Sequence, residues 1–207
     1  MGSNPIGVIM KLEVPFYPQT SATNCGPAAL QMVLAYFGKQ LRLKQIEDSA
    51  GIESGKGLYT IQLAIAAARF GFSVRFYTTS LGLNPAHADM TFYKNYASMN
   101  ESRMASLVCA ARSAGIVLEE RTVPLKELLS YVHRDSLALG LLNWNTVKGV
   151  DEYQGHFVPV VGYDDEFVYV HNSGLGSGQS FVPIERRLFD KARKAAGTDE
   201  DVLVITR

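Results

Sequence analysis

The sequence has few of the features that mark disulfide-rich, membrane-spanning or polyanion-binding proteins. Its 207 residues include only two cysteines, too few for the dense disulfide framework of a small secreted domain. The longest apolar runs, at 137–142 and 158–162, fall far short of the roughly 20 residues that cross a bilayer. The 20 basic and 20 acidic residues cancel, which gives no net charge to attract nucleic acid or an anionic membrane. We therefore expect a cytoplasmic protein without nucleic-acid or membrane partners.

Metal and phosphate motifs are also missing from the sequence. None of the four histidines and two cysteines shows the short paired spacing that zinc sites prefer. The glycine-containing segments 51–57 and 174–178 lack the spacing of a phosphate-binding loop, and we expect turns there. Asp164-Asp165 and Asp199-Glu200-Asp201 are expected to be solvated turns. The sequence thus predicts no cofactor and no metal.

Length and composition favour one globular domain over residues 1–207. With 47% hydrophobic and 19% charged residues, the chain can bury a core and has no composition typical of disorder. The start lacks the basic region and apolar core of a signal peptide, and Met1-Gly2-Ser3 is typical of a cloning remnant. Residues 1–10 are therefore expected to be a tag or a disordered start.

The most informative motif is Asn24-Cys25-Gly26-Pro27, which follows Gln19. Pro27 suits the first position of a helix, and the apolar residues that follow at helical spacing end before Gly38. This pattern predicts a helix over 26–37 with Cys25 at or beside its N-cap. Free N–H groups and the helix dipole there favour a thiolate, with a pKa lowered from about 8.5 to roughly 3.5–7.5. The sequence predicts a charged nucleophile at neutral pH, and the alternative is a small, inert core residue.

A nucleophilic thiol needs a base, and His156 is the candidate. It begins an apolar run that predicts a strand over 156–163, and 167–172 is its expected hairpin partner across Asp164-Asp165. A short turn brings Asn172 opposite His156 or one residue off, close enough for its amide to hold the imidazole. The alternative for His156 is a satisfied core histidine.

The other histidines have simpler explanations. His171 alternates to the opposite face from Asn172 and is expected to be an ordinary core or surface residue. His133 ends a helical pattern, where a cation complements the helix dipole. His87 lies in a loop without a visible partner. The second cysteine, Cys109, is expected to pack in the core.

Gln19 is the candidate for stabilising negative charge on the substrate. Attack by a thiolate on a carbonyl creates an oxyanion, and the natural donors are the backbone N–H of Cys25 and the Gln19 side-chain amide. The alternative is an ordinary loop glutamine beside Pro18.

Several motifs resemble the papain-like clan, specifically its bacteriocin-processing peptidase-like group, at Val14-Pro15-Phe16-Tyr17-Pro18-Gln19, Asn24-Cys25-Gly26-Pro27-Ala28, Gly155-His156-Phe157-Val158 and Gly162-Tyr163-Asp164. A second resemblance, over nearly the whole chain, is to the family named for a guanylyl cyclase domain, whose members share the papain-like Gln, Cys, His and Asn/Asp pattern. It is carried by Tyr59-Thr60-Ile61-Gln62-Leu63-Ala64, Phe70-Gly71, Tyr153-Gln154-Gly155-His156-Phe157 and Gly197-Thr198-Asp199-Glu200-Asp201. The resemblance implies a papain-like fold and a Cys25–His156–Asn172 triad with Gln19 at the oxyanion hole. Many members of the wider group carry Asp-Pro where this chain has Asn172-Ser173.

The coarse pattern predicts an α+β fold, with a helical part packed against an antiparallel sheet and the active site in the cleft between them. Thr60 is the expected N-cap of the third helix. The segments 79–100 and 144–155 either shape the cleft or simply cover the core. Helices are expected near 26–37, 42–49, 60–70, 101–114 and 125–133, and strands near 73–77, 116–121, 137–143, 156–163, 167–172 and 202–205.

These features predict a cysteine-dependent hydrolase, a peptidase or amidase, that cleaves an amide or isopeptide bond through an acyl-thioester. The alternative is an acyltransferase or amide-forming enzyme that uses the same site. A guanylyl cyclase and an inactive binding module are the remaining classes. The expected partner is a peptide, protein or small amide substrate, and the sequence does not indicate the oligomeric state.

Overall fold

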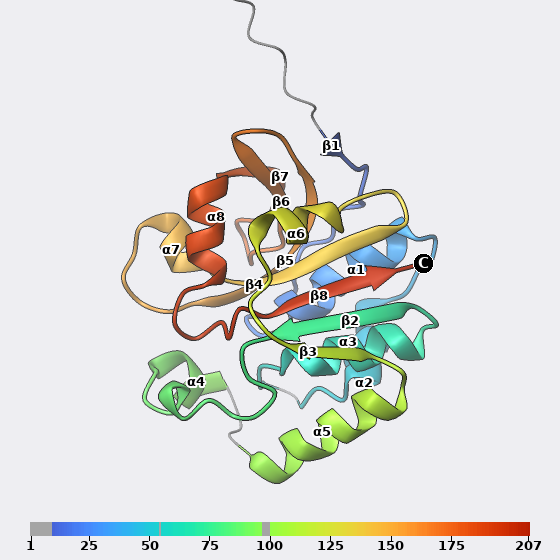
Figure 1. Cartoon of the computed structure of the whole chain (residues 1–207), viewed down its shortest axis with the longest axis vertical. Coiled ribbons are helices and arrows are strands. Elements are labelled where there is room, and N and C mark those ends of the chain that lie inside the picture. Colours follow the sequence, from blue (N-terminus) through green and yellow to red (C-terminus); the bar gives the residue numbers. More distant parts are fainter. Residues whose placement is uncertain (1–9, 54, 97–99) are drawn as a thin grey trace, which may run out of the picture.

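A mixed β-sheet runs through the centre of the protein (Figure 1). The structure is a computed structural model that describes residues 10–53, 55–96 and 100–207. The strand order is β3-β2-β8-β4-β5-β6-β7, and β1 pairs with β5 off this path. The strands are β1 (Met10–Lys11), β2 (Ser73–Thr78), β3 (Val117–Glu120), β4 (Ser136–Asn143), β5 (Gly155–Tyr163), β6 (Phe167–Asn172), β7 (Gln179–Glu185) and β8 (Val202–Thr206).

Helices cover both faces of the sheet. On one face α1 packs on β4 and β5, and α3 packs on β2 and β8, with α2 and α5 outside α3. On the other face α8 packs on β4, β6 and β7, with α7 beside it. The helices are α1 (Cys25–Tyr36), α2 (Leu43–Ala50), α3 (Thr60–Arg69), α4 (Thr91–Tyr96), α5 (Glu101–Ser113), α6 (Leu125–Ser130), α7 (Trp144–Lys148) and α8 (Arg186–Arg193), with a 3-10 turn at Pro85–His87.

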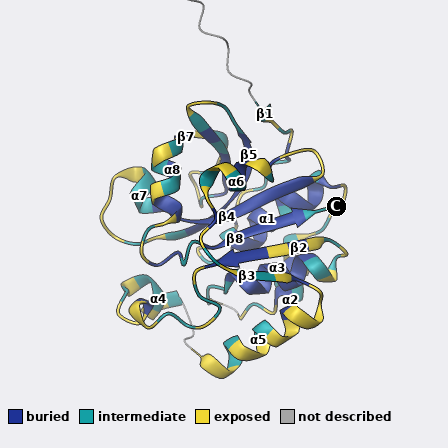
Figure 2. Ribbon diagram, in the orientation of Figure 1, coloured by how far each residue is buried: buried dark blue, intermediate teal, exposed yellow. Residues whose placement is uncertain are grey.

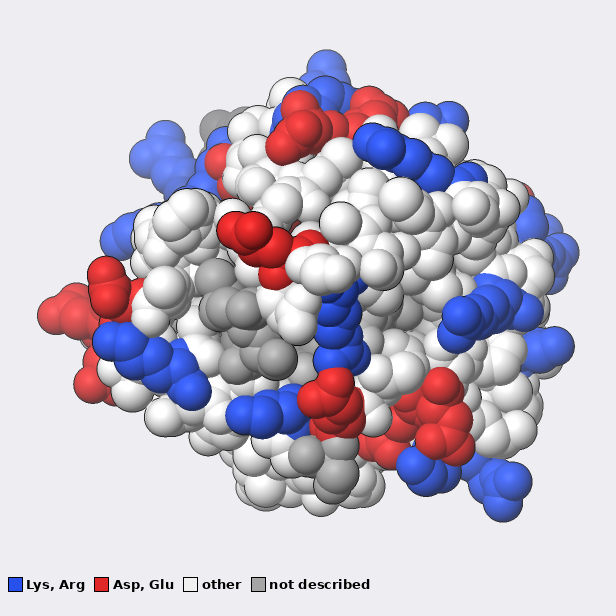
Figure 3. Space-filling model, turned by 90° about the horizontal axis from the view of Figure 1, so that it is seen from below, with Lys and Arg blue, Asp and Glu red and all other residues white. Residues whose placement is uncertain are grey.

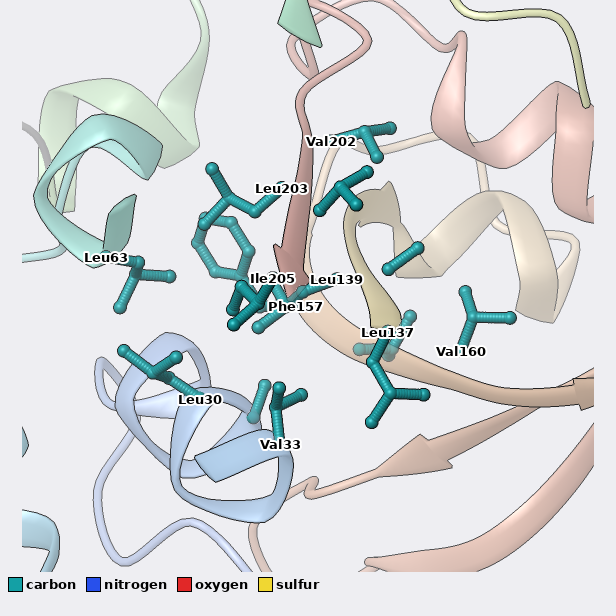
Figure 4. Packing of buried hydrophobic residues seen from close by; sticks show 14 of the residues in the cluster. Leu30, Val33, Leu63, Leu137, Leu139, Phe157, Val160, Val202, Leu203 and Ile205 are labelled. Atoms are coloured by element: carbon teal, nitrogen blue, oxygen red, sulfur yellow. The ribbon is translucent and has the colours of Figure 1, made fainter. Parts of the chain in front are cut away.

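The core lies mainly between α1, α3 and the central strands. Every residue of β4 is buried, because helices cover both faces of this strand, which therefore has a continuous apolar run (Figure 2). Leu30 and Val33 of α1 point toward Leu139, Phe157 and Ile205 of three neighbouring strands (Figure 4). This packing holds the first turn of α1 against the sheet.

The α+β class and the expected positions of helices and strands are confirmed. The sheet follows the expected antiparallel pattern except between β2 and β3, which run parallel and make the sheet mixed. The pattern also misses β7, the last strand in the sheet order, which contains Pro183 and has no clear alternation of burial. An edge position tolerates proline because one side of the strand needs no ladder hydrogen bonds.

Several local expectations are wrong. Cys109 is exposed, because the face of α5 that packs inward carries Met104, Leu107, Val108 and Ala111. The helix expected to reach His133 ends at Ser130, so His133 caps no helix and instead forms an isolated bridge with Ser136. Met10, expected in a tag or disordered start, pairs with Tyr163, while residues 1–9 lie outside the described part of the chain.

Gly162 allows β1 to approach β5, and its replacement tests that pairing. A Cβ at Gly162 would overlap the carbonyl oxygen of Met10, whereas a Cβ at Gly140 of β4 would meet nothing within 4 Å. We expect Gly162→Ala to destabilise the fold by about 1–3 kcal/mol through overpacking. Gly140→Ala should be neutral or stabilise by about 0.4–1 kcal/mol. Urea unfolding midpoints measure both variants, and equal midpoints would contradict the close approach.

Candidate active site

Cys25 is the first residue of α1, as the sequence predicts, and Asn24 is the N-cap. The Asn24 side chain does not cap the helix but fixes the preceding loop. Its Oδ1 accepts hydrogen bonds from the backbone N–H groups of Thr20 (3.1 Å) and Ser21 (3.0 Å). Its Nδ2 donates to Thr20 Oγ1 and to Glu47 Oε1, both at 3.0 Å. Asn24 therefore sets the shape of the loop between Gln19 and the thiol, a role that its helix-cap position in the sequence does not reveal.

The first turn of α1 lies close against β5. A Cβ on Gly26 would come within 3.0–3.1 Å of side-chain carbons of Leu58, Leu63 and Phe157, so only glycine fits there without a shift. The half-buried thiol of Cys25 is hydrogen-bonded by the backbone N–H groups of Phe157, Gly26 and Cys25 itself. The nucleophile candidate thus touches the residue that follows His156.

Burial raises the pKa of the Cys25 thiol above the ordinary value of a cysteine. The three backbone N–H groups lower this pKa, but they do not offset the loss of solvation. The direction of this shift opposes the expectation of a thiolate at neutral pH. The helix start does supply N–H donors to the sulfur, but desolvation of the anion outweighs them.

His156 is buried beside Trp144, with their ring centroids 5.2 Å apart. Burial lowers the pKa of His156 to about 4; a hydrogen bond from the ring to the Asn172 side chain acts in the opposite direction, and the charge of Lys148 lowers it further. Nε2 is buried and has no hydrogen-bond partner among the described residues, and the Asn172 side chain lies close enough to the ring to raise its pKa. At neutral pH the ring is an uncharged imidazole with a free acceptor nitrogen.

Asn172 is fixed by the glycine-rich turn that follows it. Its Oδ1 accepts from the backbone N–H of Gly174 (2.9 Å), and its Nδ2 donates to the carbonyl oxygen of Ser177 (3.3 Å). The segment 174–178 is thus a turn, as expected, and it orients the amide that bonds to His156.

The β5–β6 register contains an irregularity. The recorded pairs run from Val160–Val170 to Tyr163–Val168, with a register shift between Val160 and Gly162. The sequence predicts that Asn172 lies opposite His156 or one residue off, but neither residue belongs to a recorded β5–β6 pair. The two side chains nevertheless lie close enough for Asn172 to raise the pKa of His156.

Gln19 is buried next to the residue that follows Asn172. Its side-chain Nε2 donates to the carbonyl oxygen of Ser21 (2.8 Å), and its Oε1 accepts from Ser173 Oγ (3.3 Å). Its backbone N–H also donates to the carbonyl oxygen of Ser173 (2.9 Å). These bonds join the loop before Cys25 to the end of β6, and they use one of the two N–H groups of the Gln19 amide.

The remaining histidines differ in how well the sequence anticipates them. His171 is fully buried, with Nε2 bonded to the carbonyl oxygen of Val14 (2.9 Å) and Nδ1 accepting from the Phe181 N–H (3.0 Å), so it is a core residue as expected. His87, expected to be without a partner, lies 3.3 Å from Asp199 Oδ1 and stacks on Tyr93. Its partner is distant in sequence, and no local pattern indicates it.

A pocket opens next to Cys25, between the start of α1, the start of α3 and the sheet. It encloses about 1250 Å³ of space, part of it open to solvent. The segment 80–96 and residues Tyr153 and Gly155 line it, so both long connections face this pocket. Asp201, expected in a solvated turn, is buried at the pocket wall and is bonded to the Thr60 hydroxyl. Thr60 is therefore not the N-cap of α3; that position belongs to Tyr59.

Acidic and basic side chains lie among uncharged ones on the face shown in Figure 3, as the zero net charge indicates. Within residues 10–53, 55–96 and 100–207, no helix has the length and apolar character of a membrane span. The same residues contain no cluster of three His, Cys, Asp or Glu side chains arranged to hold a metal.

Comparison with known proteins gives both a family and a fold. Residues 14–205 match the family described as guanylylate cyclase. The chain is 30% identical to "Guanylyl cyclase 1" of Arabidopsis thaliana, over 94% of this chain and 76% of that protein.

Three solved structures have a similar fold. One is a C39-like peptidase from Bacillus anthracis (TM-score 0.60, 14% identity, 97% of this chain and 98% of that one). Another is a double glycine motif protease from an AMS/PCAT transporter in complex with the leader peptide (0.57, 18%, 98% and 99%). The third is the peptidase domain of Streptococcus ComA (0.51, 12%, 95% and 98%). The protein therefore belongs to the guanylylate cyclase family by sequence, and its fold is the papain-like fold of C39 peptidase domains.

Proposed function

We propose that the protein is a cysteine-dependent hydrolase that cleaves an amide or isopeptide bond through an acyl-thioester on Cys25. One observation carries the proposal. The Cys25 thiol lines a pocket and is hydrogen-bonded to the backbone of Phe157, the neighbour of a buried histidine whose Nε2 lacks a partner among the described residues. A nucleophile, a base and space for a substrate at one place are the requirements of acyl transfer.

The resting pair is neutral on both sides, so proton transfer accompanies attack. Nε2 of His156 takes the thiol proton while Sγ bonds to the substrate carbonyl carbon. The resulting imidazolium gives that proton to the leaving amine as the C–N bond breaks. Water then attacks the thioester, with His156 again the base, and the acid product leaves while the thiol is restored. Asn172 stabilises the transient imidazolium through its Oδ1 and keeps Nε2 toward the substrate.

The oxyanion of the tetrahedral intermediate requires donors near the sulfur. The backbone N–H of Cys25 is one, and the second N–H of the Gln19 amide is the other. Each such donor is typically worth about 2.7–4 kcal/mol in the transition state. Support for Gln19 comes from its burial and from its bonds to Ser21 and Ser173, which restrict the amide to one orientation.

The nature of the acceptor defines the alternative. An amine in place of water would accept the same acyl group and make the protein an amide-forming acyltransferase. One structure of this fold is a protease bound to a leader peptide, which supports a peptide as the acyl donor. The Arabidopsis relative carries a cyclase name, so cyclic-nucleotide formation should be measured together with amide cleavage.

Removal of the sulfur should abolish activity, and removal of the base should weaken it. We expect no peptide or amide cleavage by Cys25→Ala, and a kcat about 10²–10⁴-fold lower for His156→Ala. Mass spectrometry of peptide-library digests measures cleavage, and Cys109→Ser is the matched control because Cys109 is exposed. Cyclic-nucleotide formation is followed in the same samples. Cleavage that survives Cys25→Ala would exclude the proposal, as would cyclase activity without any acyl chemistry.

A neutral thiol–imidazole pair has a distinct pH dependence. A raised thiol pKa means that the reactive anion appears at a higher pH than in free cysteine, and iodoacetamide labelling of Cys25 in a Cys109→Ser background should be slow at pH 7 and accelerate above pH 8. Activity should persist at acidic pH and disappear as pH falls through about 4, where His156 becomes protonated. Rapid labelling below pH 7 would indicate a thiolate–imidazolium pair instead.

Asn172 should control the proton affinity of His156. Its hydrogen bond raises the His156 pKa, so Asn172→Ala should move the titration of that ring to still lower pH, while Asn172→Asp should move it up because a carboxylate stabilises the imidazolium. Loss of one hydrogen bond, about 0.5–1.5 kcal/mol, predicts a kcat roughly 3–10-fold lower for Asn172→Ala. NMR titration of the ring protons measures the shift, and buried His171 is the internal reference. An unchanged His156 titration would show that Asn172 does not orient the ring.

A further inference from the structure

The pocket beside Cys25 has a carboxyl group at its far wall. Asp201 directly precedes β8, and its carbonyl oxygen accepts from the N–H of Leu141 (3.1 Å). Leu141 in turn pairs with Phe157, whose backbone N–H contacts the thiol. The backbone of Asp201 is therefore two strand spacings away from the backbone of Phe157, a distance of about 10 Å. This distance is within the reach of an extended substrate residue and its side chain.

One oxygen of this carboxyl group has no partner among the described residues. Asp201 is only 9% exposed, and its Oδ2 accepts from the Thr60 hydroxyl. The Thr78 hydroxyl is nearby, but it donates to the carbonyl oxygen of Ser80 (3.0 Å). Oδ1 is the buried oxygen that these hydroxyls leave without a hydrogen bond. Buried carboxyl oxygens are normally paired, because an unpaired one costs free energy, and such an oxygen on a pocket wall suits a donor brought by a ligand.

The neighbouring charged groups do not supply that donor. Asp199 is satisfied by His87 (3.3 Å) and by the amide of Asn84 (2.8 Å). None of the ion pairs among the described residues includes Asp201. Arg103, which also lines the pocket, is paired with Glu53. Tyr93 and Tyr153 also face Asp201. Burial raises the pKa values of both tyrosines, and the negative charges of Asp201 and Asp199 raise them further.

Burial also sets the protonation of Asp201. It raises the pKa of Asp201 to about 7, and the charge of Asp199 also raises it, whereas the hydroxyls of Thr60 and Thr78 and the nearby His87 lower it. A bound cation would favour the carboxylate and release the proton. Besides Lys56 and the Arg103–Glu53 pair, the pocket lining is mainly apolar or aromatic and includes Leu58, Leu81, Leu83, Phe92, Tyr96 and Met104.

We propose that this pocket binds an acyl donor with a cationic side chain, an ammonium or a guanidinium on an apolar stem, and that Oδ1 of Asp201 accepts its N–H. Lysine and arginine side chains combine such a stem with a charged tip. A neutral tip would leave the carboxyl without a charge partner, and an anionic tip would be repelled. The inference rests on the proposed function for its acyl donor, but the binding site can be tested without any catalysis.

The first experiment measures binding in protein that cannot react. Calorimetric titrations of Cys25→Ala protein use butylamine, butylguanidine and 1-butanol as probes of equal stem length. We expect saturable binding of at least one cationic probe, at least 10-fold tighter than 1-butanol. The comparison of the two cations distinguishes the ammonium from the guanidinium.

The second experiment replaces the carboxyl group of Asp201, the proposed hydrogen-bond acceptor. Asp201→Asn in the same background should weaken the cationic probe at least 10-fold and leave 1-butanol unchanged. Asp165→Asn is the matched control, since it removes the same charge from an exposed turn. Equal binding of the cationic probe by the Asp201→Asn and Asp165→Asn proteins would overturn the proposal, as would absence of saturable binding. Guanosine is the competing probe, because its N–H edge also suits a carboxylate; Asp201-dependent guanosine binding without cation binding would overturn the proposal too.

A proton count keeps the test valid if Asp201→Asn does not fold. At pH 6 the binding of a cationic probe should release up to one proton, and at pH 9 it should release almost none, because Asp201 is then already ionised. Titrations in buffers of different ionisation enthalpy measure this number. Binding without proton release at pH 6 would contradict a role for Asp201. If the protein binds the cationic probe but cleaves no amide, the proposed hydrolase function is wrong and the proposed cation site stands. If it cleaves amides but does not bind the probe, the cation site is wrong and the hydrolase function stands.

Discussion

The close contact between the first turn of α1 and β5 is the constraint on which the site depends. Gly26 permits it, because any side chain there would press on Leu58, Leu63 and Phe157. The buried side chains of Leu30 and Val33 then hold the helix on the sheet (Figure 4). As a result the half-buried thiol at the helix start meets a backbone N–H of the strand. The chemistry of Cys25 is set by this packing as much as by the helix start.

Loss of solvation acts on both Cys25 and His156. Desolvation disfavours the charged form of any group, so it raises the pKa of the acid Cys25 and lowers that of the base His156. Both shifts favour the neutral pair. Under the proposed hydrolase mechanism, charge separation would then occur when a substrate brings its carbonyl to the thiol.

Local patterns predict the parts of the site that depend on one segment of chain. Proline and the apolar spacing after Cys25 indicate the helix start, and the two apolar runs around Asp164-Asp165 indicate the hairpin that carries His156 and Asn172. The burial of each group is not contained in these patterns. Three separate segments supply it, and for this reason the sequence suggests a thiolate where packing favours a thiol.

Asp201 illustrates a second limit of sequence reasoning. Its place at the end of an unbroken acidic run suggests a solvated turn, yet Asp201 is buried because its backbone joins the ladder of β4 and its side chain meets Thr60 from α3. These partners lie 60 and 141 positions away in sequence, and only the fold brings them together. Cys25 and Asp201 therefore line the same pocket, His156 directly precedes Phe157 of its lining, and the pKa of each of the three groups is shifted toward its neutral form. With a pKa of about 7, Asp201 is only partly ionised at neutral pH, so binding of a cationic ligand at that wall releases part of a proton. Recognition at this wall therefore depends on pH in a way that the thiol and imidazole alone would not produce.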